Sequence, residues 1–154
     1  MNPPIGIVNN RQILYFDRAQ FSNLSSWIPK SDWMLFAIAD PEQEHLLEQL
    51  AKTCLNNGVL YVCGAGKAGS SIDNTFDFEI VDRKIEKGED DYSDTPMTTW
   101  HEDLAEGFWY ATTVASHDTL IIDTIVCINL TEHDYKSQLE NLIDRINTGW
   151  LPED

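Results

Sequence analysis

The sequence is short of basic residues and has no long apolar run. It holds 10 Lys and Arg against 26 Asp and Glu, a formal net charge of -16 over 154 residues. Proteins that bind nucleic acid or anionic membranes need a basic surface, so this shortage argues against both kinds of partner. No apolar run approaches the roughly 20 residues that a membrane span requires. The start of the chain also lacks the basic and apolar stretches of a secretory signal, and we therefore expect a cytoplasmic protein.

The cysteines and histidines show no pattern of a disulfide or metal site. Cys54, Cys63 and Cys127 are widely spaced, form no C-x-x-C pair and lie in apolar runs, where cysteine behaves as a small core hydrophobe. A disulfide framework or a zinc site is therefore not expected. The four histidines lack metal-ligand spacing, and no serine stands in a G-x-S-x-G turn. We expect no metal and no cofactor.

The apolar pattern predicts an α/β fold. With 42% hydrophobic residues, the chain has enough apolar side chains for a packed core. We expect a single α/β domain over residues 1–154, with residues 1–11 as an irregular lead-in. Short apolar runs bounded by turn residues predict strands at residues 13–16, 33–39, 59–63 and 120–128. Helical spacing between and after these runs predicts a three-layer α/β/α sandwich with a mostly parallel sheet of about four strands.

The strand–helix–strand unit at residues 33–63 has the clearest local signals. Asp40 is expected to cap the helix, with Pro41 at its first position and Gln43 completing a capping box. Asn57-Gly58 supplies a left-handed stop before the next strand. The two strands should therefore pair in parallel.

Three later helices are predicted. The first follows a glycine-rich turn, and the second opens at Thr99-Trp100-His101-Glu102, which has the pattern of a capping box. The third closes the chain at residues 131–147. Apolar residues expected near one face of the first helix are Ile72, Phe76, Ile80, Val81 and Ile85.

The glycine-rich turn fits the G-x-G-x-x-G pattern. Gly64, Gly66 and Gly69 follow a predicted strand and precede a predicted helix, so they are candidates for holding a pyrophosphate through backbone amides. The turn follows the third predicted strand rather than the first, however, and the acids that follow it would repel a phosphate. The alternative interpretation is a flexible strand-to-helix turn at the carboxyl edge of the sheet.

His101 stands beside carboxylates at the predicted helix start. It is a candidate catalytic acid–base if it faces a pocket and has an orienting partner. The alternative is that Glu102 is the capping glutamate, and that it and the neighbouring acids stabilise the positive end of the helix.

The excess of acidic residues is the most prominent feature of the sequence. Between Asp73 and Glu106 there are twelve acids and three bases. Aromatic residues interleaved with these acids are typical of a protein-binding face, and the carboxylates would steer a basic partner. The candidate partner-binding residues are Glu86, Glu89, Asp90, Asp91, Tyr92, Asp94, Trp100, Glu102, Asp103, Glu106 and Trp109. The alternative is that the acids form a solvated surface and the aromatic residues belong to the core.

Three segments resemble a family of small, uncharacterised bacterial α/β domains. They are Gly58-Val59-Leu60-Tyr61, Met97-Thr98-Thr99-Trp100-His101-Glu102 and Phe108-Trp109-Tyr110-Ala111, and the resemblance covers about half the chain. It implies an α/β fold and nothing about mechanism. In size and acidity alone, the chain is similar to the immunity proteins of bacterial toxin systems, which bind basic toxin domains.

The leading hypothesis is a non-enzymatic protein that neutralises or regulates a basic protein partner such as a toxin domain. One alternative is a small nucleotide-binding or enzymatic domain that uses the Gly64–Gly69 turn. Another is a structural subunit of a larger assembly, including a homo-oligomer, with the aromatic residues at a self-interface.

Overall fold

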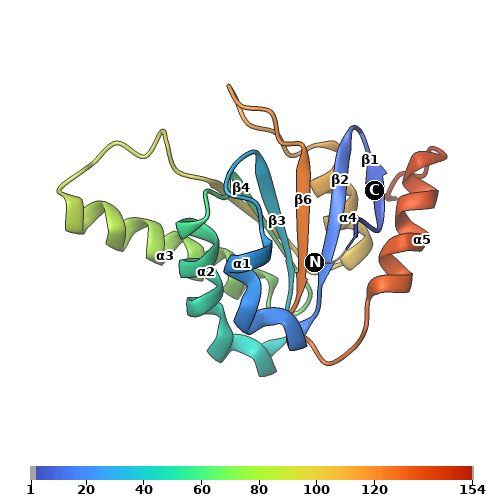
Figure 1. Cartoon of the computed structure of the whole chain (residues 1–154), viewed down its shortest axis with the longest axis horizontal. Coiled ribbons are helices and arrows are strands. Elements are labelled where there is room, and N and C mark those ends of the chain that lie inside the picture. Colours follow the sequence, from blue (N-terminus) through green and yellow to red (C-terminus); the bar gives the residue numbers. More distant parts are fainter. Residues whose placement is uncertain (1–2, 154) are drawn as a thin grey trace.

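The computed structural model describes residues 3–153 and contains a sheet with a helical layer on each face (Figure 1). The strands are β1 (Gly6–Val8), β2 (Arg11–Phe16), β3 (Trp33–Ile38), β4 (Tyr61–Ala65), β5 (Met97–His101) and β6 (Thr124–Asn129). Their spatial order is β1-β2-β6-β3-β4-β5. β1 is antiparallel to β2, and every other neighbouring pair is parallel. The mostly parallel α/β fold is confirmed, but the expected number of about four strands is wrong, because the described residues form six.

The helices change face where the chain reverses its direction across the sheet. They are α1 (Leu24–Trp27), α2 (Leu47–Asn56), α3 (Gly69–Lys87), α4 (Leu104–Thr113) and α5 (Lys136–Asn147), with 3-10 segments at Arg18–Asn23 and Pro41–Leu46. α1, α2 and α3 cover one face, while α4 and α5 cover the other (Figure 1). The chain moves from β3 through β4 to β5 along the first face, and α4 returns it to β6 along the second. Right-handed crossovers require this change of face.

Side chains of successive strand residues alternate between two apolar layers. Leu14, Phe16 and Leu35 point toward α1, α2 and α3, whereas Ile13 and Tyr15 point toward α4 and α5. The central strands β3 and β6 are buried on both faces, which explains why β3 is continuously apolar and why residues 125–128 of β6 are apolar.

The strand–helix–strand unit forms as its capping residues predict. The Asp40 amide donates to Gln43 Oε1 at 2.9 Å, and Gln43 completes a capping box. The helix begins as a 3-10 turn and continues as α2. β3 and β4 then pair in parallel, with Leu35 opposite Val62.

The amino-terminal segment is more regular than the sequence suggests. Gly6–Val8 forms β1, where an irregular lead-in over residues 1–11 is expected; residues 1–2 lie outside the described residues. Asn9 and Asn10 have φ angles of 50° and 64°, the left-handed conformation that a tight hairpin needs. Asn9 Nδ2 also donates to Thr112 O at 3.0 Å, which fastens the hairpin to α4.

The segment around His101 is a strand rather than a helix start. The capping box predicted at Thr99–Glu102 is wrong, because Met97–His101 pairs with β4 as β5. α4 begins after Asp103, whose side chain accepts a hydrogen bond from the Ala105 amide at 2.9 Å.

The last strand and helix are shorter than predicted. β6 begins at Thr124, and exposed Leu120 and Ile121 belong to the loop before it. α5 begins at Lys136. Among the described residues, no helix has both the length and the apolar composition that a membrane crossing requires.

Candidate functional site

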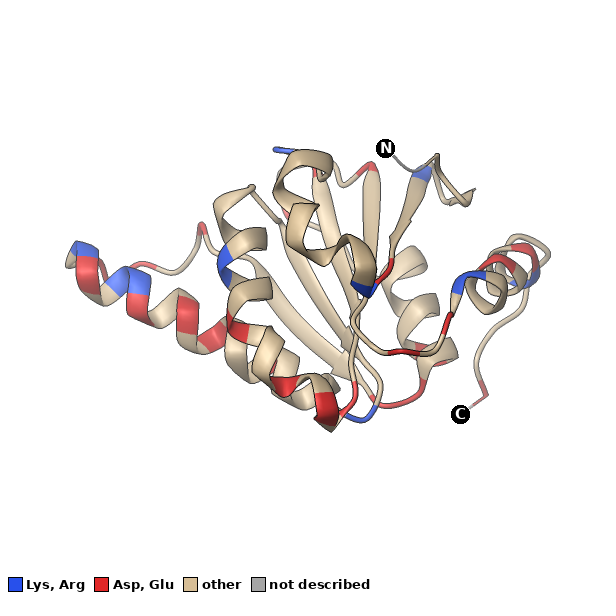
Figure 2. Ribbon diagram, turned by 60° about the horizontal axis from the view of Figure 1, so that its bottom comes forward, with Lys and Arg blue, Asp and Glu red and all other residues tan. Residues whose placement is uncertain are grey.

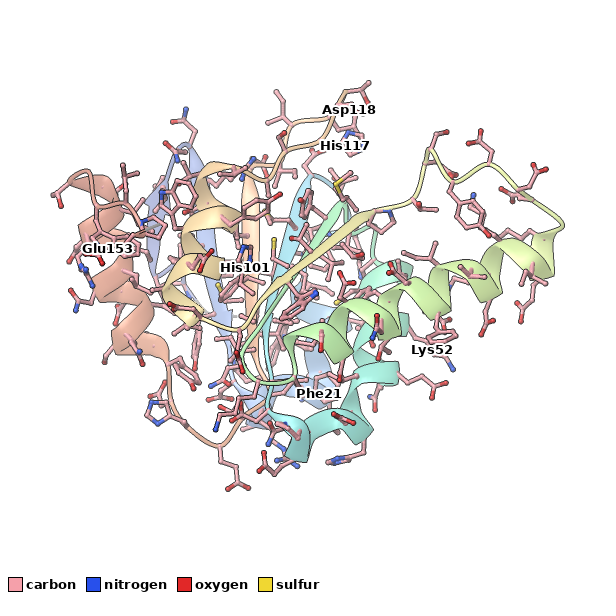
Figure 3. The ribbon with its side chains drawn as sticks, turned by 180° about the vertical axis from the view of Figure 1, so that it is seen from behind. Phe21, Lys52, His101, His117, Asp118 and Glu153 are labelled. Atoms are coloured by element: carbon pink, nitrogen blue, oxygen red, sulfur yellow. The ribbon has the colours of Figure 1, made fainter. Side chains whose placement is uncertain are left out.

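β5 forms one edge of the sheet and is the centre of the candidate site. It pairs with β4 on one side, and no other strand of residues 3–153 pairs with it. Met97 is 62% exposed and Trp100 is 48% exposed, so large apolar side chains meet solvent along this edge. In Figure 3, β5 runs along the outside of the molecule toward His101.

The two faces of β5 have different neighbours. Thr99 Oγ1 donates to Cys63 Sγ at 3.5 Å, and the His101 ring lies 5.1 Å from that of Tyr110 on α4. Thr98 Oγ1 donates to Asp77 Oδ1 of α3 at 2.9 Å. Because side chains alternate along a strand, Trp100 points to the same side as Thr98, toward α3.

A buried lysine organises the acidic loop before β5. Lys84 Nζ lies 3.0 Å from Glu89 Oε2 and 2.7 Å from Asp94 Oδ1, although the Lys84 side chain is only 9% exposed. The hydrogen bond from Lys84 lowers the pKa of Asp94. Gly88 ends α3 with a left-handed φ of 68°, and the Glu89 amide donates to Lys84 O at 2.9 Å. The loop is therefore folded back on α3.

The tip of this loop presents an aromatic side chain beside a cavity. Asp91 Oδ1 accepts a hydrogen bond from the Ser93 amide at 2.9 Å, which lowers the pKa of Asp91. Exposed Tyr92 lines a cavity of about 440 Å³ together with Met97 and His117. The amino end of β5 thus carries both acids and apolar surface.

The carboxyl end of β5 carries the second group of acids. Glu102 and Asp103 follow the strand, and Glu106 lies in the first turn of α4, where its charge suits the positive helix end. Trp109 is half-buried and lines a cavity of about 460 Å³ with His101 and the carboxyl-terminal segment.

The candidate partner-binding residues therefore form two groups, not one. Tyr92 and the acids from Glu86 to Asp94 lie on the last turn of α3 and in the loop that leads into β5, and the other members lie at the carboxyl end of β5 or in α4. All are exposed except half-buried Trp109. Figure 2 shows acidic residues along α3, on α5 and on several loops.

Further residues beside this edge were not among the candidates. Asp73 and Asp77 are four residues apart on α3, and Asp73 Oδ1 is buried with no hydrogen-bond partner among the described residues. Burial raises the pKa of Asp73, and the negative charge of Asp77 also raises it. Their spacing was visible in the sequence, but the strand beside them was not.

The outer face of α3 contains two residues that were predicted to lie near its buried face. Val81 and Ile85 were expected near the buried face, but both are exposed and form a stripe with Phe78. These residues lie three and four positions apart, which places them on one side of the helix. The far end of α3 extends beyond the sheet (Figure 1), and all three side chains of the stripe are exposed to solvent.

The glycines of the Gly64–Gly69 turn are explained by packing. Gly66 has a φ of 93°, and a Cβ there would lie 2.6 Å from Ala39 O. A Cβ on Gly64 would lie 2.7 Å from Gly69 O. The Ala68 amide donates to Ala39 O, and the Gly69 amide donates to Gly66 O, both at 3.0 Å. Two amides that a phosphate would need are thus already bonded within the protein.

The Nδ1 atom of His101 lacks an orienting hydrogen bond in the described part of the chain. This atom is buried and has no hydrogen-bond partner within residues 3–153. General acid–base catalysis normally requires such a partner. No group of three or more His, Cys, Asp and Glu side chains in the described chain is arranged to hold a metal ion.

A separate polar cluster joins the carboxyl ends of β2 and β6. Tyr15 Oη accepts hydrogen bonds from Asn129 Nδ2 at 3.0 Å and from the Tyr135 amide at 3.1 Å, and it lies 3.3 Å from Asp134 Oδ1. Shallow cavities of about 330 and 320 Å³ flank this cluster. Its hydrogen bonds fasten the loop between β6 and α5, which is a structural role.

The fold and this edge define a doubly wound α/β domain whose edge strand β5, paired with β4 on one side, is preceded and followed by acidic residues. The chain belongs to the family described as a domain of unknown function, DUF7684, whose model matches residues 13–146. This match confirms the expected membership of an uncharacterised domain family. Comparison with curated proteins gave no match. Comparison with solved structures gave none either.

Proposed function

We propose that this protein binds and regulates a basic protein partner, for which a toxin domain neutralised by an immunity protein is one example. The observation that carries the proposal is the exposure of acidic and aromatic side chains at both ends of β5. Tyrosine and tryptophan are enriched at protein interfaces, where they supply anchors within a polar rim.

The charge of the molecule supports the same kind of partner. A net charge of -16 produces a field that attracts a positively charged protein and speeds their encounter. The same field disfavours nucleic acid and anionic membranes. We place this interaction in the cytoplasm, as the sequence leads us to expect.

The test begins with affinity purification of the native protein from its source cells, followed by identification of what co-purifies. The association rate of the purified pair is then measured at about 0.05 M and about 0.5 M NaCl. We expect a basic partner whose association slows by about tenfold or more at the higher salt concentration, because salt screens the attraction. An unchanged rate would contradict electrostatic capture.

A matched pair of variants separates the local surface from the net charge. Glu86→Gln with Asp90→Asn removes two charges near the amino end of β5, and Glu140→Gln with Asp144→Asn removes two exposed charges from α5. The first variant should bind the partner more weakly than the second. Equal effects would mean that the site lies elsewhere on the protein.

The nucleotide-binding alternative stays a prediction with its own test. Thermal-shift measurements with nucleotides would detect binding, and Lys67→Glu should then remove it, because Lys67 is exposed in the glycine turn. Lys67 is a better probe than Gly66, where any side chain would strain the backbone. The assembly alternative is tested by sedimentation at several protein concentrations.

A further inference from the structure

The two edges of the sheet differ in how they are protected. β1 has three residues, and Asn147 Nδ2 already donates to the Ile7 carbonyl at 2.9 Å. β5 has five residues, none of them Lys, Arg or Pro. Proteins usually protect an edge strand with such residues, since its free N–H and C=O groups can pair with another chain. β5 is therefore open to strand addition.

Apolar surface lies beside the open edge. Trp100, which points to the α3 side of β5, is 48% exposed. Met97 is exposed at the amino end of the strand. An added strand would cover part of this surface while satisfying the free backbone groups of β5.

The acidic residues before and after β5 favour a basic segment over a second copy of this chain as the added strand. Two copies of this chain pairing through β5 would bring acidic groups together from both ends of each strand, and like charges would repel. A basic segment would instead be attracted by the acidic groups at both of its ends. Side chains on the α3 side would also approach Asp73 and Asp77, which have no basic partner among the ion pairs of the described residues.

We infer that β5 binds an extended segment of the basic partner as an added strand, with apolar residues at its centre and Lys or Arg at both ends. This inference rests on the proposed function and identifies the form of ligand that the acidic site takes. The strand itself sets the length of the paired segment: five residues at roughly 3.3 Å each make β5 about 16 Å long, and the acidic groups lie before and after it.

The test uses a synthetic peptide, Lys-Lys-Val-Thr-Val-Thr-Val-Lys-Lys, labelled with a fluorophore for anisotropy titration. Its control, Lys-Lys-Val-Pro-Pro-Pro-Val-Lys-Lys, has the same charge and an extended backbone but lacks central N–H groups. We expect the full-length protein to bind the first peptide about tenfold more tightly than the second. Equal affinities would overturn strand addition.

Two variants locate the binding edge. Met97→Lys places a positive charge on β5, and Ile7→Lys makes the same change on β1 at the opposite edge, where the side chain is also 62% exposed. Met97→Lys should reduce affinity for the first peptide to that for the proline peptide, and Ile7→Lys should not. Circular dichroism establishes that both variants are folded. Equal effects of the two variants would contradict binding at β5.

The outcomes also separate this inference from the proposed function. If both peptides bind equally and salt weakens both, basic capture stands and strand addition fails. If neither peptide binds at low salt, strand addition fails and electrostatic capture of basic segments is contradicted as well.

Discussion

At the scale of single residues, Lys84 holds the acidic loop in place through Glu89 and Asp94. Lys84→Met should release the loop, because both carboxylates lose their common partner inside a region of like charge. Limited proteolysis with an enzyme that cuts after Asp and Glu measures this directly, as faster cleavage within residues 89–94.

Lys87 provides the control for this prediction, because it is exposed on the last turn of the same helix. Lys87→Met removes the same charge and should leave the cleavage rate nearly unchanged. Equal acceleration in both variants would show that net charge, and not the Lys84 contacts, governs the loop.

Asp73 should give the stability of the protein a recognisable pH dependence. Burial raises its pKa above the ordinary value of 3.8, so the folded state binds a proton more tightly than the unfolded state does. The contribution of Asp73 to the free energy of unfolding should therefore be lost as pH rises from 3.8 through the folded pKa. Urea unfolding across this range should show a smaller fall for Asp73→Asn than for the unsubstituted protein.

Asp82→Asn is the matched control, since Asp82 is exposed on the same helix. It should leave the pH profile of stability close to that of the unsubstituted protein. If Asp73→Asn and Asp82→Asn gave the same profile, burial of Asp73 would not be the cause.

At the scale of elements, the turn between β4 and α3 depends on Gly66. Gly66→Ala should destabilise the protein by about 2 kcal/mol or more, because the new Cβ meets Ala39 O in a left-handed conformation. Gly149 has a similar φ of 100° with nothing within 4 Å of its Cβ position. Gly149→Ala should lower the free energy of unfolding by only about 1 kcal/mol. The difference between the two variants, measured by chemical denaturation, gives the cost of the contact between the new Cβ at position 66 and Ala39 O. Equal costs would contradict the close packing.

Arg11 joins the start of β2 to the end of α4. Its guanidinium donates to Ala111 O at 2.8 Å, Ala115 O at 2.6 Å and Ile122 O at 3.2 Å. Arg11→Met should lower the free energy of unfolding by about 2 kcal/mol, because these carbonyls lose a charged donor. Arg18 forms an exposed pair with Glu132 at 3.8 Å, so Arg18→Met should cost under about 1 kcal/mol. Thermal and urea unfolding measure the loss in free energy of unfolding for both variants. Equal losses for Arg11→Met and Arg18→Met would contradict this role of Arg11.

The sequence predicted elements whose signals are local. β3, α2 and β4 have capping residues and apolar runs that act within a few positions, and all three formed, although β4 begins and ends two residues later than the predicted 59–63. β1 and β5 have no such signals. β1 has only three residues and depends on the Asn9-Asn10 turn that pairs it with β2. β5 is a half-exposed edge strand in which Thr98 bonds to α3 and the His101 ring contacts α4.

The candidate site was predictable in composition but not in arrangement. The acids and aromatic residues could be identified by counting. Their separation into two groups depends on β5 lying between them, and that pairing is a tertiary contact with β4. The exposure of Val81 and Ile85 likewise depends on α3 extending past the sheet, which helical spacing alone does not reveal.

At the scale of the whole molecule, self-repulsion should make stability depend on salt. Raising NaCl from about 0.05 M to about 0.5 M should increase the free energy of unfolding by about 1 kcal/mol at neutral pH, because screening reduces repulsion among the acids. Near the pI of about 4.3 the net charge vanishes, so the increase should become small. An equal increase at both pH values would indicate a general salt effect instead.

The unequal edges of the sheet also limit how this protein can aggregate. Growth of a fibril requires each subunit to offer two free strands, one to receive a neighbour and one to be received. Here Asn147 already bonds the Ile7 carbonyl on the β1 edge, so within residues 3–153 β5 is the more open of the two edges. A strand added at β1 would have to displace Asn147, which should slow polymerisation through the native sheet.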